Sequence, residues 1–283
     1  MTLRGNAVNI LGNDRYLLIW RNDIKIPIYQ VDAFAENVFS GNPAAVCPLD
    51  EWLPTETMQA IAEENNLSET AFFLPNRNSF DIRWFTPKAE IDLAGHPTLA
   101  TAHAIFTELE PGRRNVTFNT KLGDTLDVVF EDDILVMNFP AHPPASADGI
   151  DKMADALGAR PTAFLDARDG FAVFETEAAV RALAPDMVKL CATKYLGVIA
   201  TAPGDDVDFV SRFFAPAHGI PEDPVTGSAH CELIPYWAAQ LEKNELDARQ
   251  ISQRGGRLYC SFLGDRVKIG GRAVTFMRGE IEI

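Results

Sequence analysis

The chain has few cysteines, and none is placed as a redox pair or a zinc ligand usually is. Four occur in 283 residues, at Cys47, Cys191, Cys231 and Cys260. There is no Cys-x-x-Cys motif, and no Cys/His group has zinc spacing. We therefore expect no bound metal, and we interpret the four thiols as small apolar core residues in a reducing compartment.

Basic residues are also scarce. The chain has 25 Lys and Arg against 40 Asp and Glu, a net charge of −15. A surface this acidic repels phosphate backbones unless it carries a local basic patch, and the only adjacent basic pair is Arg113-Arg114. We expect no nucleic-acid partner and no attachment to anionic lipid.

Long apolar runs are missing as well. No run reaches the roughly 18 residues that a membrane-spanning helix needs. Near the N-terminus the longest apolar stretch, Tyr16–Trp20, is short and bracketed by charges, unlike a signal peptide. The sequence thus predicts a cytoplasmic protein without a membrane span. Residues 1–24 lack a clear period, and we expect an N-terminal extension there, with 15–20 as a candidate edge strand.

What the sequence does contain is a strand-rich pattern with a few helices. Strands are predicted at 26–34, 44–48, 69–74, 80–86, 116–119, 125–130, 134–139, 195–202 and 207–215, followed by three that close the chain. Helices are predicted at 54–65, with Thr55 as cap, and at 97–108, 152–157, 178–183 and 224–241. The proline-rich stretch 140–147 is a candidate linker. We expect an N-terminal domain over 25–140 and a C-terminal domain over 141–283, whose last strand or strands can cross back.

The two predicted domains share a spaced pattern. Residues 83–87 (RWFTP) resemble 212–216 (RFFAP), and each block is followed by a second match, in which His96-Pro97 corresponds to Asp223-Pro224. Each half is then expected to hold a strand, a loop and a helix that opens with proline. If a pseudo-twofold axis relates the halves, both helix starts face one cleft. Their free N–H groups and partial positive charge favour an anion, most simply a small carboxylic acid.

His96 and Asp223 are candidate site residues because of these positions. Asp is a common helix cap, so Asp223 also has an ordinary structural interpretation. Histidine caps helices poorly, so His96, which follows Gly95, calls for another reason. Across a cleft, an imidazole and a carboxylate can tune one another and handle protons.

Three further residues are candidates for the site. Glu69 begins an apolar strand, where a solvated charge would be ordinary, and its approximate counterpart near Gly197 is not acidic. Gly227 allows a ligand to approach the backbone. The Ser228 hydroxyl is suited to bond either a ligand or its own helix.

Five motifs together resemble a known family. They are Tyr29-Gln-Val-Asp-Ala-Phe34, Gly41-Asn-Pro43, Leu67-Ser-Glu-Thr70, Asp92-Leu-Ala-Gly-His-Pro97 and Glu222-Asp-Pro-Val-Thr-Gly-Ser228. The chain resembles, from Ile26 nearly to its C-terminus, the phenazine-biosynthesis-like (PhzF-type) isomerases, which are related in fold to diaminopimelate epimerase.

The resemblance implies an α+β fold of two pseudo-symmetric domains, each a curved, mostly antiparallel sheet or barrel around a central helix, with the active site between them. It implies that Glu69 transfers protons, that His96, Asp223 and Ser228 hold the substrate and assist, and that homodimers are common. The related epimerases use two cysteines as opposed bases. This chain has His96 and Asp223 at the matching positions, which disfavours a two-thiol racemase.

The leading hypothesis is a cofactor-independent isomerase in which Glu69 moves a proton on a small carboxylic acid. Gly95, Gly227 and Ser228 would bind the carboxylate and stabilise negative charge as it develops. Two alternatives stay open. One is an epimerase or racemase of a small amino or hydroxy acid with a second base opposite Glu69, and the other is a catalytically silent ligand-binding protein.

Overall fold

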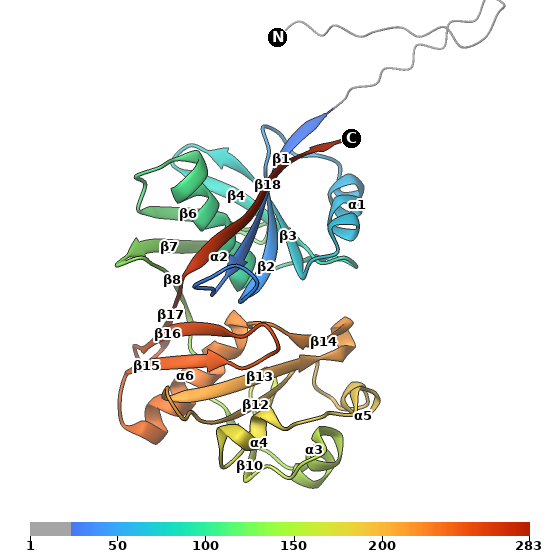
Figure 1. The fold of residues 1–283 in the computed structure, drawn as a ribbon, viewed down its shortest axis with the longest axis vertical. Coiled ribbons are helices and arrows are strands. Elements are labelled where there is room, and N and C mark those ends of the chain that lie inside the picture. The colour runs from blue at the N-terminus through green and yellow to red at the C-terminus, as the bar shows by residue number, and fades with distance from the viewer. Residues whose placement is uncertain (1–23) are drawn as a thin grey trace, which may run out of the picture.

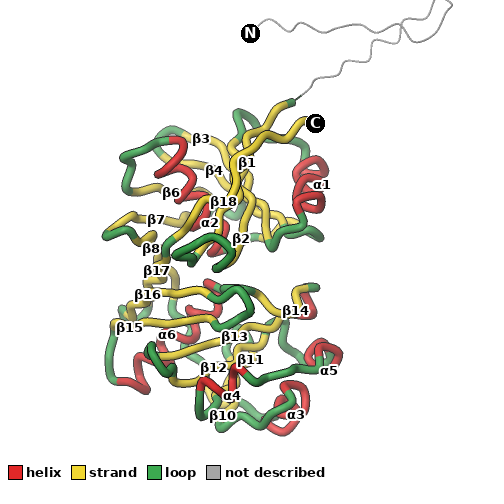
Figure 2. The backbone as a smooth tube through the Cα atoms, viewed as in Figure 1, coloured by secondary structure: helices red, strands yellow, loops and turns green. Residues whose placement is uncertain are grey.

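The computed structural model describes residues 24–283, which form two bodies built mainly of strands (Figures 1 and 2). The extension expected over 1–24, with its candidate edge strand, lies outside the described residues apart from Ile24. The Ile24 amide donates to the carbonyl of Ile283 (2.8 Å), so the described chain begins beside its own C-terminus.

The strands of the upper body in Figure 1 come from the first half of the chain and from its last ten-residue strand. They are β1 (Lys25–Ala33), β2 (Asn42–Pro48), β3 (Glu69–Asn76), β4 (Ser79–Phe85), β5 (Glu90–Ile91), β6 (Asn115–Asn119), β7 (Thr125–Glu131), β8 (Ile134–Pro140) and β18 (Ala273–Glu282). The helices of this body are α1 (Thr55–Asn65) and α2 (Gly95–Ala104), the latter extended by a π-helical turn, η1 (Ile105–Leu109).

The lower body contains the remaining elements. Its strands are β9 (Ala145–Ser146), β10 (Ala163–Asp166), β11 (Gly170–Val173), β12 (Val198–Pro203), β13 (Phe209–Ala215), β14 (Ile220–Asp223), β15 (Glu245–Gln250), β16 (Gly256–Phe262) and β17 (Arg266–Gly271). Its helices are α3 (Ile150–Leu157), α4 (Glu177–Arg181), α5 (Met187–Cys191), the 3₁₀ turn η2 (Pro216–His218) and α6 (Gly227–Leu241).

Strand pairing follows the same order in both bodies. In the upper body β2–β3 and β4–β6 are parallel pairs, whereas β3–β4, β6–β7 and β7–β8 are antiparallel. In the lower body β11–β12 and β13–β15 are parallel, whereas β12–β13, β15–β16 and β16–β17 are antiparallel. The chain therefore has an α+β fold of two pseudo-symmetric domains, each a curved, mostly antiparallel sheet.

The two sheets join where β8 pairs antiparallel with β17. Beyond this junction the chain changes body twice. After β8 it enters the lower body, where β9 pairs with β10, and after β17 it returns to the upper body, where β18 pairs with β1 along its length (Figure 1). These two crossings and the β8–β17 pairing hold the two bodies together, and the site lies beside them.

One helix occupies the centre of each sheet. Eight of the ten residues of α2 are buried, and α2 contacts β1, β2, β3 and β8; α6 packs on β15, β16 and β17. A helix that is apolar on nearly all sides belongs in a core. The shorter helix α1 covers the outer side of the upper sheet, and α3, α4 and α5 lie on the outer side of the lower one (Figure 1).

The structure corrects three local predictions. Thr55 does not cap α1: it is the first helical residue, after Pro54, and its hydroxyl accepts a hydrogen bond from Arg83 instead. Four strands rather than three close the chain. Cys191 is exposed at the end of α5, whereas Cys47, Cys231 and Cys260 are buried as expected.

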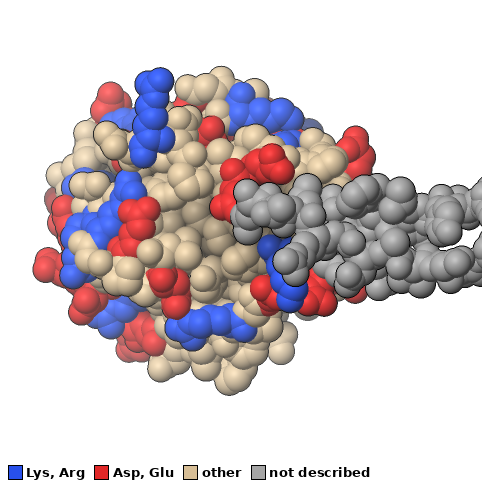
Figure 3. All heavy atoms as spheres, turned by 90° about the horizontal axis from the view of Figure 1, so that it is seen from above, with Lys and Arg blue, Asp and Glu red and all other residues tan. Residues whose placement is uncertain are grey.

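The charged side chains are mixed on the face that Figure 3 shows, with Lys and Arg interspersed among Asp and Glu. Of the helices within residues 24–283, none has the length and apolar character that crossing a membrane requires.

Candidate active site

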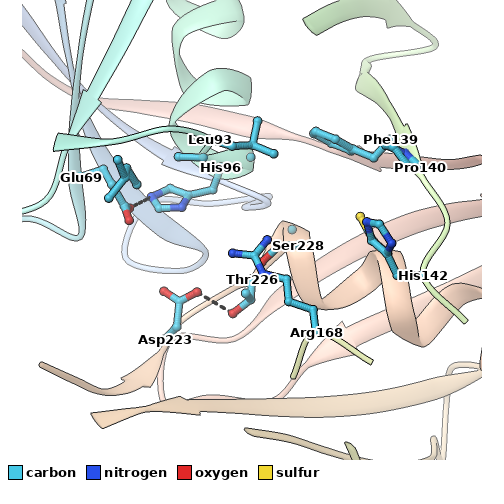
Figure 4. Close-up of a pocket in the computed structure, with 15 residues that line it drawn as sticks. Glu69, Leu93, His96, Phe139, Pro140, His142, Arg168, Asp223, Thr226 and Ser228 are labelled. Carbon is cyan, nitrogen blue, oxygen red and sulfur yellow. Dashed lines mark hydrogen bonds and ion pairs between the residues drawn. The ribbon is translucent and has the colours of Figure 1, made fainter. Parts of the chain in front are cut away.

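A small cavity lies where the two bodies meet. Its volume is about 220 Å³, below the ~300–1,000 Å³ of typical drug-sized sites, so its ligand must be small. The lining combines apolar side chains with a few polar groups from both bodies (Figure 4). The lining residues are Glu69, Ile91, Leu93, Ala94, Gly95, His96, Phe139, Pro140, His142, Arg168, Asp223, Thr226, Gly227, Ser228 and Cys231. All six residues singled out from the sequence therefore lie around one cavity.

The two central helices begin at this cavity and nearly touch. A Cβ placed on Gly95 would lie 3.6 Å from the Cα of Gly227, and one placed on Gly227 would lie 3.7 Å from the Cα of Gly95. Neither helix has a side-chain cap hydrogen bond: the residues before them are Ala94 and Thr226. The first N–H groups of both helices thus remain available at one place, which suits an anion.

The helices start at other residues than predicted, and the alignment of the two halves of the chain therefore changes as well. α6 begins at Gly227 rather than Pro224, and Asp223 is the last residue of β14 rather than a helix cap. The reason is Gln250, which accepts a hydrogen bond from the amide of Thr226 (2.8 Å) and donates to the carbonyl of Asp223 (2.7 Å). These bonds hold residues 223–226 out of the helix.

Two matching ion pairs, one in each body, show which residues of the two halves correspond. Arg83 makes a bidentate ion pair with Glu90 (2.7 and 2.8 Å), and Arg212 makes one with Glu222 (2.7 and 2.9 Å). Each glutamate precedes its helix start by five residues. Gly95 therefore corresponds to Gly227 and His96 to Ser228, so the prediction that His96 and Asp223 occupy equivalent places is wrong.

Glu69 and His96 form the buried centre of the site. Oε2 of Glu69 lies 3.1 Å from Nε2 of His96, and the two residues are 9% and 7% exposed. Burial, and secondarily the charge of Asp223, raises the pKa of Glu69 to about 8, while burial lowers the pKa of His96 to about 3. At neutral pH the contact is therefore mainly one between a carboxylic acid and a neutral imidazole.

Asn42 lies beside this imidazole, with its amide nitrogen 3.3 Å from Nδ1 of His96. Its amide nitrogen donates to Oδ1 of Asp223 (2.8 Å) and to the carbonyl of Val225 (2.9 Å), while its oxygen accepts from Ser68 (3.1 Å). Both amide hydrogens are thus used. We assign the Nδ1 proton of His96 to a hydrogen bond with the carbonyl of Pro43, which leaves the Nε2 lone pair facing Glu69.

Asp223 lies on the opposite body from Glu69 and is half-buried. Burial raises its pKa to about 6, although hydrogen bonds from Thr226 and Asn42 oppose that rise. Asp223 is consequently ionised at neutral pH, while Glu69 is mostly protonated. Two carboxyl groups of one cavity are thus placed in different protonation states, an arrangement found in acid–base sites.

The second body has no counterpart of Glu69 on the equivalent strand. Thr70 pairs with Phe85 and Val198 with Phe214, so Glu69 corresponds to Gly197. A Cβ on Gly197 would lie 2.3 Å from the ring of Phe213 and 2.6 Å from a carboxylate oxygen of Asp169, which together fill the space of a side chain. The sequence prediction that only one half supplies a carboxylate from this strand is borne out by the register.

Four polar residues of the site were not predicted from the sequence: Asn42, Thr226, Arg168 and His142. Asn42 lies in the Gly41-Asn-Pro43 motif, which supports the family resemblance but predicts no role for this amide, and Thr226 lies inside the helix predicted over 224–241. Arg168 stands in no motif and lies outside any predicted element, between the helices predicted at 152–157 and 178–183. Only the first two carried a signal, because both belong to motifs shared with the family that the chain resembles.

Comparison with known proteins decides the family. A family model described as "Phenazine biosynthesis-like protein" matches residues 31–279. The chain belongs to this family. It is 50% identical over 262 residues to an "Uncharacterized isomerase" of Pseudomonas aeruginosa, covering 92% of this chain and all of that protein.

Solved structures agree with this family assignment. The crystal structure of a PhzF-family phenazine biosynthesis protein from Enterococcus faecalis has a TM-score of 0.89 and 46% identity, covering 92% of this chain and all of that one. A hydroxyproline epimerase from Agrobacterium vitis shares the fold alone, with a TM-score of 0.57 and 11% identity over 93% and 94% of the two chains. The phenazine biosynthesis-like resemblance and the epimerase-like fold are thus both confirmed.

Proposed function

We propose that this phenazine biosynthesis-like protein is an isomerase that moves a proton on a small carboxylic acid without a cofactor. The observation that carries the proposal is the buried contact between Glu69 and His96 beside two uncapped helix starts. A carboxyl group with a pKa near 8 accepts a proton as a carboxylate and retains it as an acid at working pH, as a group that shuttles a proton must.

The proposed reaction has two proton transfers. The ionised Glu69 removes a proton from an activated carbon: a C–H bond breaks, an O–H bond forms on Glu69, and the electron pair shifts through the adjacent double bond toward the substrate carboxylate. Glu69 then returns the proton to another carbon, so the double bond has moved and nothing is oxidised or reduced. His96 holds the acid form of Glu69 between the steps by accepting its O–H.

The substrate carboxylate would bind at the starts of α2 and α6. Gly95 and Gly227 are the first residues of these helices, which have no side-chain cap, and both line the cavity together with Ser228, whose hydroxyl would add a further donor. These donors would also stabilise the negative charge that develops when the proton leaves.

The experiment is a solvent-exchange screen. Small unsaturated carboxylic acids are incubated in D₂O with the wild-type protein, Glu69→Gln or the exposed control Glu63→Gln, and proton NMR follows loss of the C–H signals. We expect deuterium to enter at two carbons with wild type and Glu63→Gln and at none with Glu69→Gln. Exchange that survives Glu69→Gln would remove Glu69 from the chemistry.

Epimerisation at a single carbon is the second candidate, because the Asp223 carboxylate lines the same cavity from the other body. Asp223, however, already accepts hydrogen bonds on both of its oxygens, which suits a holding role better than that of a second base. Chiral analysis of the exchanged product separates the two reactions. Exchange confined to one carbon, with inversion there, would favour the epimerase, and tight binding without any exchange would favour a silent binding protein. The homodimer and the cytoplasmic location stay predictions.

A further inference from the structure

Arg168 provides the only Lys or Arg side chain among the described residues that line the cavity. It lies in the loop between β10 and β11 and is exposed. Within residues 24–283 no hydrogen bond or ion pair engages its guanidinium, although ten other arginines of this part of the chain are so engaged. In Figure 4 the guanidinium points into the cavity, toward Ser228.

The backbone that carries Arg168 is fixed on its C-terminal side. The neighbouring Asp169 is 5% exposed and its carboxylate packs against Gly197. The amide of Gly170 donates to the carbonyl of Gly197 (3.0 Å), and a Cβ on Gly170 would lie 3.0 Å from the ring of Tyr195. Only the arginine side chain is left free, so a ligand that binds it does not have to order the loop.

The site offers anion-binding groups of two different kinds. The helix starts present N–H groups from Gly95 and Gly227, enough for one carboxylate, and Arg168 adds a planar fork of donors that matches a carboxylate in bidentate fashion. A formal positive charge without a protein partner is therefore better explained by a second anionic group on the ligand.

We propose that the substrate is a small dicarboxylate, held by one carboxylate at the starts of α2 and α6 and by the other on Arg168. The cavity volume of about 220 Å³ excludes large ligands. This inference rests on the proposed function for its substrate, but its binding geometry does not depend on which proton Glu69 moves.

A purely structural role for Arg168 is the rival explanation. Its charge also acts on the buried carboxyl groups of Asp169 and Glu232, which lie close to it. A structural role predicts that removing Arg168 alters the stability of the fold and weakens all carboxylate ligands alike. A ligand-binding role predicts that only the second carboxylate is affected.

The test measures dissociation constants by titration calorimetry with unreactive probes. Succinate and glutarate are compared with their monoamides, succinamate and glutaramate, which keep the shape but lose one charge. We expect wild type to bind at least one diacid roughly tenfold or more tighter than its monoamide, because a charge-assisted hydrogen bond contributes about that much. In Arg168→Met the preference disappears while monoamide binding is unchanged, and Arg168→Lys retains part of it.

Arg160→Met serves as the matched control, because it removes one positive charge from the same body outside the cavity lining. It should keep the full preference for the diacid. Equal binding of diacid and monoamide to wild type, a preference that survives Arg168→Met, or binding of neither probe overturns the proposal. Tighter, Arg168-dependent binding of 3-phosphonopropionate than of succinate overturns the choice of a carboxylate. If Glu69→Gln still exchanges deuterium while the Arg168-dependent preference holds, the isomerase chemistry fails and the ligand assignment stands.

Discussion

Oε2 of Glu69 and Nε2 of His96 lie 3.1 Å apart, both in buried residues of the cavity lining, and burial moves their two pKa values in opposite directions. Desolvation disfavours the charged form of each group, so an acid becomes weaker and an imidazole becomes a weaker base. The proton between them therefore resides on Glu69 until the pH approaches 8.

This relationship predicts a directly observable titration. In protein labelled with ¹³C at glutamate side-chain carboxyls, one resonance that is missing from Glu69→Gln should titrate with a midpoint of about pH 8. Since only ionised Glu69 accepts a proton, turnover should rise with pH up to this midpoint and level off above it. His96→Asn should lower the midpoint, because an amide N–H can donate to the carboxylate and favour the charged form. A Glu69 resonance that titrates near 4.5 would contradict the proposed role.

The two facing glycines predict a loss of binding without a loss of stability. In Gly95→Ala and Gly227→Ala the new methyl group meets only ordinary contact distances, 3.6 and 3.7 Å from the opposite Cα. Both variants should fold, with melting temperatures close to that of wild type. Each methyl group stands where the substrate carboxylate would lie, so succinate affinity should fall roughly tenfold or more, as for a lost charge-assisted hydrogen bond. Gly279→Ala in β18 is the control. Unchanged succinate binding in both variants would move the carboxylate site elsewhere.

The sequence was sufficient to predict the fold class, the family and the six residues around the cavity. Hydrophobic alternation and the motif Leu67-Ser-Glu-Thr70 are local features, so both can be recognised from the sequence alone. The alignment of the halves failed, because the similarity of Pro97 to Pro224 suggested equivalent helix starts. What delays α6 is Gln250, which lies 23 residues beyond Gly227, and no local pattern reports such a contact.

Arg168 illustrates the other limit of sequence reasoning. Its role follows from the cavity that it lines, and four separate chain segments build that cavity with it: the start of β3, β5 with the start of α2, the end of β8, and the end of β14 with the start of α6. The loop 167–169 has no turn motif or spacing that relates it to Glu69. Long-range juxtaposition of this kind comes from sheet topology, here the parallel pairing of β11 with β12 that sets residue 169 against Gly197.

Asn42 is predicted to position both sides of the site. Its buried amide joins Ser68 and the Asp223 carboxylate, which come from different bodies. Asn42→Ala should cost roughly 1–3 kcal/mol in the free energy of unfolding, because buried partners lose their hydrogen bonds. It should also raise the pKa of Asp223, since that carboxylate loses a donor. Urea unfolding and carboxyl NMR measure the two effects, with Asn76→Ala, whose bond to Asp81 is exposed, as the control. Wild-type values for both quantities would show that Asn42 is dispensable.

Glu232 predicts a pH-dependent stability that is separate from catalysis. It is fully buried in α6, and burial together with the neighbouring Asp169 raises its pKa to about 8. A carboxyl group whose pKa is higher in the folded than in the unfolded state binds more protons when folded, so stability falls as pH rises from about 4.5 to about 8. Glu232→Gln removes this loss. Below pH 5 the free energies of unfolding of this variant and of wild type should differ only by a constant offset. By pH 9 the difference between them should have grown by on the order of 1–3 kcal/mol.

Urea unfolding at pH 5, 7 and 9 tests this, with Glu63→Gln, an exposed position on α1, as the matched control. The control should follow the wild-type curve at all three pH values, because a solvated carboxyl group titrates alike in both states. Parallel curves for wild type and Glu232→Gln would mean that the buried carboxyl keeps an ordinary pKa. A growing difference would instead show that the lower body contains a buried, protonated acid next to Asp169, five residues after the start of α6.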